Sequence, residues 1–206
     1  MGSKTIQFVF RKEKKDVNQL SALDERDKHL LLKLARSSIE SELIEGEKIK
    51  RPAEPKPAML EKRGCFVTLH KRGVLRGCIG TIEPITSLLA NVEENSKNAA
   101  FKDPRFPSLT KDEISDIDIE ISVLTIPKKL SFVDGEDLKR KLKPGIHGVI
   151  LSQGWHRSTF LPQVWVQLPD KEEFLECLCQ KGCMEKTSWK SSDTTVQIYE
   201  VEYFSE

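Results

Sequence analysis

The sequence predicts an α+β fold in which helices flank antiparallel sheets. Residues 116–123 alternate Ile or Val with Asp, Glu or Ser, which is typical of a strand with one buried and one wet face. Two β-hairpins are expected, at residues 65–76 and 148–161, with turns at Lys71-Arg72-Gly73 and Gln153-Gly154. Helices separate the strands without the regular strand–helix–strand alternation of a parallel sheet, which favours α+β.

Three amphipathic helices are expected. The first begins at Ser21, with Asp24 three residues later as in a capping box, and ends at Gly46. The second begins at Pro84 and stops at Asp103-Pro104. The third runs from Asp170, an N-cap residue, to Gly182, and a shorter helix covers residues 134–142.

The two ends of the chain differ in character. Residues 1–20 are polar and basic and predict a loose arm, whereas residues 21–206 are expected to form a single domain. The chain closes on a strand over residues 194–204. Its alternation slips between Ile198 and Tyr199, which we interpret as a β-bulge.

Composition excludes several classes of protein. The 33 Lys and Arg residues nearly cancel the 32 Asp and Glu residues, so no overall charge favours nucleic acid or an acidic membrane surface. No apolar run is long enough for a spanning helix or a secretory leader. The five cysteines are odd in number and scattered, which favours reduced thiols and a cytoplasmic location.

The most unusual segment is residues 75–80. Gly77 and Gly80 lie on either side of Cys78, so the backbone can approach a ligand closely, and at least one glycine is expected to have a positive φ. Arg76 is placed to lower the pKa of the Cys78 thiol or to bind an anion, which predicts that Cys78 is the most reactive thiol. The alternative is a tight turn around a buried, inert cysteine.

Further candidate residues lie elsewhere in the chain. Arg105 and Arg157 each follow a turn and, with Arg76, could form a cationic mouth for a phosphate or carboxylate. His147 and His156 bracket the second hairpin and are the plausible pair for proton transfer. No metal site is expected, because a helix turns Cys177 away from Cys179 and Cys183, and no cofactor is expected either. The list of candidate site residues is Arg76, Gly77, Cys78, Gly80, Arg105, His147, His156 and Arg157.

Four segments resemble the AMMECR domain family, known in microbes as AmmeMemoRadiSam system protein A. They are Leu75-Arg76-Gly77-Cys78-Ile79-Gly80-Thr81, Asp103-Pro104-Arg105-Phe106, Phe160-Leu161-Pro162-Gln163-Val164 and Leu178-Cys179-Gln180-Lys181-Gly182. The resemblance spans about residue 20 to residue 204. It departs at Gly182-Cys183, where relatives tend to show Ala-Gly, and this makes Cys183 a poor candidate for a shared role.

The resemblance implies two lobes, the larger carrying both chain ends and the smaller inserted into it. It also implies that the Arg-Gly-Cys-Ile-Gly motif is the suspected functional site. Microbial relatives are encoded beside a Memo-like protein and a radical S-adenosylmethionine protein, which implies a shared pathway with such partners.

The sequence is compatible with two hypotheses about function. In the first, the groove at residues 75–80 binds a small anionic ligand or a partner segment. In the second, the protein is an enzyme or enzyme subunit in which Cys78 acts as nucleophile or redox thiol and a histidine moves protons. The sequence lacks a Ser-His-Asp set and a phosphate-cradling loop, which favours binding. Burial of Cys78 would favour binding further.

Overall fold

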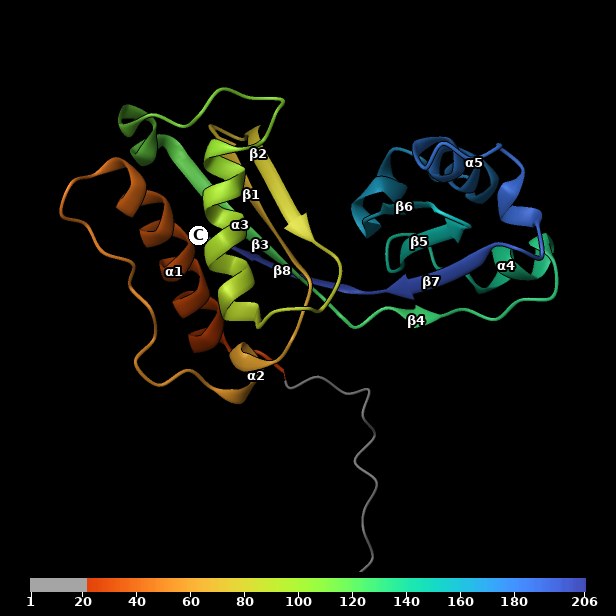
Figure 1. The fold of residues 1–206 in the computed structure, drawn as a ribbon, viewed down its shortest axis with the longest axis horizontal. Helices are drawn as coiled ribbons and strands as arrows, with labels where there is room; N and C mark the ends of the chain where they lie inside the picture. Colours follow the sequence, from red (N-terminus) through yellow and green to blue (C-terminus); the bar gives the residue numbers. More distant parts are fainter. Residues whose placement is uncertain (1–21) are drawn as a thin grey trace, which may run out of the picture.

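The fold contains two four-stranded antiparallel sheets with flanking helices, which confirms the predicted α+β class (Figure 1). The computed structural model describes residues 22–206, so the predicted N-terminal arm and Ser21 lie outside the described residues. The helices are α1 (Glu25–Leu43), α2 (Pro57–Leu60), α3 (Leu88–Phe101), α4 (Gly135–Lys141) and α5 (Lys171–Lys181), with 3-10 helices at Lys111–Asp116, Pro162–Val166 and Ser188–Lys190.

The first sheet has the strand order β2-β1-β3-β8, and α1 and α3 cover one of its faces (Figure 1). Alternate residues of β1 and β3 point into this layer, and Val67, Ile119 and Ile121 are fully buried there beside Leu31 of α1 and Leu88 of α3. The strands are β1 (Cys65–Lys71), β2 (Val74–Thr81), β3 (Ile117–Leu124) and β8 (Val201–Ser205).

The second sheet has the order β4-β7-β5-β6 and is formed by residues 128–199, which lie between β3 and β8 in the chain. Its core is distinct from that of the first sheet and centres on Phe174, whose ring stacks on Trp165 with centroids 3.6 Å apart. A third cluster, which includes Leu124, Ile150 and Phe66, joins the two sheets. The strands are β4 (Lys128–Lys129), β5 (Gly148–Gln153), β6 (His156–Phe160) and β7 (Thr195–Tyr199).

Two predicted helix starts differ from the structure. Helix α1 begins after Asp24, whose carboxylate accepts from the Asp27 amide at 2.9 Å while Asp27 accepts from the Asp24 amide in return. Helix α3 begins after Ser87 and not at Pro84, because the Ser87 hydroxyl accepts from the amide of Ala90.

The predicted bulge in the last strand is wrong. The alternation slips near Tyr199 because β7 ends there and β8 begins in the other sheet, so Glu200 is the point at which the chain crosses between sheets. The opposite crossing, from β3 towards β4, runs beside it. The amide of Thr125 donates to the Glu200 carbonyl at 2.9 Å, and the amide of Glu200 donates to Thr125 Oγ1 at 2.9 Å.

Candidate functional site

The segment around Cys78 is a strand and not a turn. A two-residue turn at Arg72 and Gly73, both with positive φ, returns the chain into β2, which continues to Thr81. Leu69 pairs with Gly77 and His70 pairs with Leu75, so Arg76 is the extra residue of a β-bulge.

The prediction that Gly77 or Gly80 has a positive φ is wrong, because neither is among the residues with positive φ. Both glycines are required by close packing instead. A Cβ on Gly77 would lie 2.2 Å from the Ala99 carbonyl oxygen of α3, and one on Gly80 would lie 2.3 Å from the Phe66 ring. The close backbone approach predicted from the sequence therefore exists, but the approaching group belongs to the protein itself.

Arg76 takes part in a buried ion pair, which corrects its predicted role as an anion ligand. It is 9% exposed, and its guanidinium donates to both carboxylate oxygens of Glu113, at 3.0 and 2.9 Å. Lys71 also donates to Glu113 at 3.0 Å. These donors, Arg76 first, hold the pKa of Glu113 well below its usual range. The pair joins β2 to the 3-10 helix before β3. Glu113 already occupies the Nε and Nη2 groups with which Arg76 would bind a ligand carboxylate.

Arg105 and Asp103 hold the backbone of Cys78. The Cys78 amide donates to Asp103 Oδ2 at 2.9 Å, Arg105 Nη2 donates to the Cys78 carbonyl at 3.2 Å, and Arg105 Nε donates to Asp103 Oδ1 at 2.9 Å. Hydrogen bonding to Arg105 lowers the pKa of the buried Asp103 carboxyl. Because β2 is an edge strand, the amide and carbonyl of Cys78 point away from β1 and have no strand to pair with among residues 22–206. Asp103 and Arg105 hydrogen-bond to these two groups as a neighbouring strand would. Residues 75–81 and 103–106, two of the segments that carry the family resemblance, therefore meet in a structural contact.

The Cys78 side chain is half-buried, and its sulfur accepts from Thr68 Oγ1 at 3.3 Å. The two candidate histidines hydrogen-bond elsewhere. His147 Nδ1 accepts from the Lys143 amide at 3.3 Å, and His156 Nδ1 contacts the Gly182 carbonyl at 3.0 Å.

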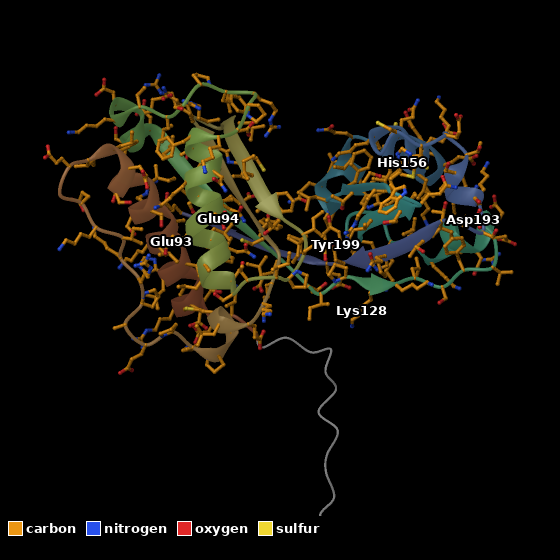
Figure 2. The ribbon with its side chains drawn as sticks, in the orientation of Figure 1. Glu93, Glu94, Lys128, His156, Asp193 and Tyr199 are labelled. Atoms are coloured by element: carbon orange, nitrogen blue, oxygen red, sulfur yellow. The ribbon has the colours of Figure 1, made fainter. Side chains whose placement is uncertain are left out.

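The expectation that His147 and His156 could meet across the second hairpin is wrong. His156 pairs with Gln153 beside the turn, whereas His147 precedes the far end of β5. His147 and Gln153 are six residues apart along extended chain, which corresponds to roughly 20 Å. Burial lowers the pKa of His147, while His156 lies exposed on the second sheet (Figure 2).

The structure changes the expected order of thiol reactivity, because Arg76 is bound to Glu113 and no longer supports early reaction at Cys78. With iodoacetamide at pH 8, we expect Cys183, the exposed thiol, to react first. Cys65 and Cys179 should react last, since both are fully buried and burial raises the pKa of each thiol, that of Cys65 to about 12. Peptide mapping over time measures this order. Labelling of Cys78 ahead of Cys183 would restore the catalytic hypothesis.

A cavity of about 570 Å³ lies where the two halves of the fold face each other. One wall comes from the end of β2, the loop after it and α3, and the other comes from β6 and α5. Arg157 is the predicted site residue that lines it, and it forms an ion pair with Glu83 of the opposite wall. The cavity lining also includes Ile82, Ile85, Asn91, Glu94, Thr159 and Lys181.

Sequence reasoning missed Glu94 and Lys181 as cavity residues. Lys181 belongs to the Leu178–Gly182 segment, and Thr81, at the end of the Leu75–Thr81 segment, also lines the cavity. Membership of these two family-like segments is a signal that the sequence contains. Glu94 has no such signal, because a carboxylate on a charged helix face looks like an ordinary solvated residue.

Within residues 22–206, no group of three or more His, Cys, Asp and Glu side chains is arranged to hold a metal ion. Over the same residues, no helix has both the length and the apolar character needed to cross a membrane.

The fold and its inter-sheet cavity define an α+β protein in which an inserted sheet packs beside a first sheet. The profile of the AMMECR1 family matches residues 32–204. The chain is 37% identical to a protein of Methanothermobacter thermautotrophicus, covering 85% of this chain and 92% of that one. It is 39% identical to a protein of Methanocaldococcus jannaschii, covering 85% and 88%. The chain belongs to the AMMECR1 family.

A crystal structure supports the same architecture. It is that of a Pyrococcus horikoshii protein described as uncharacterised, which superposes with a TM-score of 0.81 at 36% sequence identity. The similarity covers 89% of this chain and 93% of the other.

Proposed function

We propose that this protein is a small-molecule-binding module whose site is the inter-sheet cavity, and that the ligand carries an anionic group. The observation that carries this proposal is the position of Lys181, which has no ion-pair partner among residues 22–206, on the wall of a cavity of about 570 Å³. Arg157 lies on the same wall and is paired with Glu83. That volume lies within the range of small-ligand pockets, which is roughly 300–1,000 Å³. Ile82 and Ile85 supply apolar surface, and the Ile85 side chain is 70% exposed.

Binding explains the structure better than the Cys78 enzyme hypothesis does. The Cys78 backbone is held by Asp103 and Arg105, its thiol is half-buried beside Thr68, and neither candidate histidine hydrogen-bonds to it. The proposed site therefore begins at Thr81, where the Leu75–Thr81 segment ends, and extends away from Cys78.

An apolar anionic fluorophore, 8-anilinonaphthalene-1-sulfonate, tests the proposal. We expect saturable binding to the folded full chain that weakens as salt rises, because the cationic wall attracts the sulfonate. Ile85→Trp fills the cavity from an exposed position and should weaken binding at least fivefold. Val133→Trp is the matched control, since Val133 is 90% exposed and does not line the cavity. Equal binding by the wild-type protein and Ile85→Trp would show that the cavity is not the site.

A further inference from the structure

The inter-sheet cavity has walls of opposite charge. Glu83 and Glu94 lie on the wall built from the first sheet and α3, whereas Arg157 and Lys181 lie on the wall built from β6 and α5. Figure 2 places Glu94 on α3, the helix that covers the first sheet. A ligand with a single negative charge would satisfy the cationic wall and leave the acidic wall facing it.

Most of the polar side chains in the cavity are already engaged within the protein. Asn91 donates to the Arg63 carbonyl at 2.6 Å and accepts from Thr81, and the hydroxyl of Thr159 donates to the Val149 carbonyl at 2.9 Å. Ser158 donates to the carbonyl of Leu178 at 2.7 Å. These contacts are demanded by the fold, so the three side chains are poor candidates for ligand recognition.

Of the four charged side chains in the cavity, two form an ion pair with each other and two do not. Arg157 and Glu83 neutralise each other across the cavity. Glu94 and Lys181 have no ion-pair partner among residues 22–206. Lys181 Nζ donates to the Thr159 carbonyl at 2.9 Å, and two of its three N–H groups remain for other acceptors. The surface of the Phe160 ring, 5.0 Å away, shields one side of the amine, and desolvation lowers the pKa of Lys181.

We infer that the ligand is a small zwitterion with an apolar body. Its carboxylate would bind Lys181, its ammonium group would bind Glu94, and its hydrocarbon portion would cover Ile82 and Ile85. This inference rests on the proposed function and adds the ammonium group. Each charge on the ligand meets a cavity-lining side chain of opposite sign that has no ion-pair partner among residues 22–206. Neither the Arg157–Glu83 pair nor the internal hydrogen bonds have to open.

Isothermal titration calorimetry on the full chain tests the inference with probes that differ by one charge. L-Leucine is compared with 4-methylpentanoate, which lacks the ammonium group, and with 3-methylbutylamine, which lacks the carboxylate. A second set of 6-aminohexanoate, hexanoate and pentylamine places the charges farther apart. We expect at least one zwitterion to bind at least tenfold more tightly than both of its single-charge analogues.

Variants identify the side chains responsible. Glu94→Gln should reduce the affinity for the zwitterion to that for the matching carboxylate, and Lys181→Met should reduce it to that for the matching amine. Glu185→Gln and Lys186→Met are controls with the same changes on exposed residues that do not line the cavity, and they should leave affinity unchanged.

The inference is overturned if both zwitterions bind no more tightly than their carboxylate analogues, or if neither zwitterion binds measurably. Unchanged zwitterion binding in Glu94→Gln would also overturn it. Suppose that the zwitterion tests fail but Ile85→Trp still weakens the binding of 8-anilinonaphthalene-1-sulfonate. The cavity then remains a binding site, and only the ligand class is wrong. If Ile85→Trp does not weaken that binding either, the proposed function itself fails.

Discussion

Replacing Gly77 with alanine should cost about 3 kcal/mol or more of unfolding free energy and is expected to be the most damaging small substitution in the β1–β2 hairpin. The added Cβ would lie 2.2 Å from the backbone carbonyl oxygen of Ala99, so neither a rotamer change nor a flexible side chain can relieve the overlap. Strand β2 would have to separate from α3, exposing apolar surface on both.

Urea denaturation followed by circular dichroism measures this loss. Val74→Ala is a control on the same strand, because Val74 is 69% exposed and its truncation should change stability by less than about 0.5 kcal/mol. If Gly77→Ala prevents soluble expression, Gly77→Ser should do the same. Stability of Gly77→Ala within about 0.5 kcal/mol of the wild-type value would show that the contact between β2 and α3 is not tightly packed.

Replacing Glu113 with glutamine should destabilise the protein by about 3 kcal/mol, because breaking a buried ion pair leaves the other charge without compensation. Arg76 is only 9% exposed and its Nη1 atom has no hydrogen-bond partner among residues 22–206, so without Glu113 the guanidinium keeps only a 3.4 Å hydrogen bond from Nη2 to the Ser108 carbonyl. Glu25→Gln is the control, since the Glu25–Lys28 pair is exposed and should contribute less than about 0.5 kcal/mol.

The same carboxylate predicts how stability changes with acid. The pKa of Glu113 is lowered in the folded protein, so its contribution is complete above the pKa of the unfolded chain, about 4.3, and is lost as the pH falls towards the folded value. Wild-type stability should therefore fall steeply below about pH 5. The fall should be shallower in Glu113→Gln, although Asp103, whose pKa is also lowered, still contributes. Parallel pH profiles for the two proteins would contradict the assigned role of Glu113.

Sequence patterns predicted the fold well because its strands carry their own signals. The alternation over residues 116–123 corresponds to β3, and the turn residues Gly73 and Gly154 identify the two hairpins. The pattern near Tyr199 does not reveal the crossing at Glu200, because a shift in alternation looks the same whether it marks a bulge or a crossing between sheets. Only pairing partners distinguish the two, and these come from segments far away in the chain.

The candidate site was harder to predict. Arg76, Gly77 and Gly80 are unusual in the sequence because the fold needs them: one forms a buried ion pair, and the others allow close packing. A lone sequence cannot distinguish that demand from ligand binding. Arg157 does line the cavity, but nothing in the sequence indicates its ion pair with Glu83. The shared pathway with Memo-like and radical S-adenosylmethionine proteins stays a prediction from the resemblance.

The hydrogen-bonded crossings at Thr125 and Glu200 bear on how this fold was assembled. Residues 128–199 leave and rejoin the first sheet at neighbouring positions, and β3 and β8 on either side are paired strands. In topological terms, the first sheet holds an ordinary β-hairpin whose loop has grown into a second sheet with its own core. Such growth costs little closure entropy, about 0.6 kcal/mol for each doubling of loop length. One insertion at a single hairpin would therefore have added the second wall, from β6 and α5, opposite a wall that the first sheet and α3 already supplied.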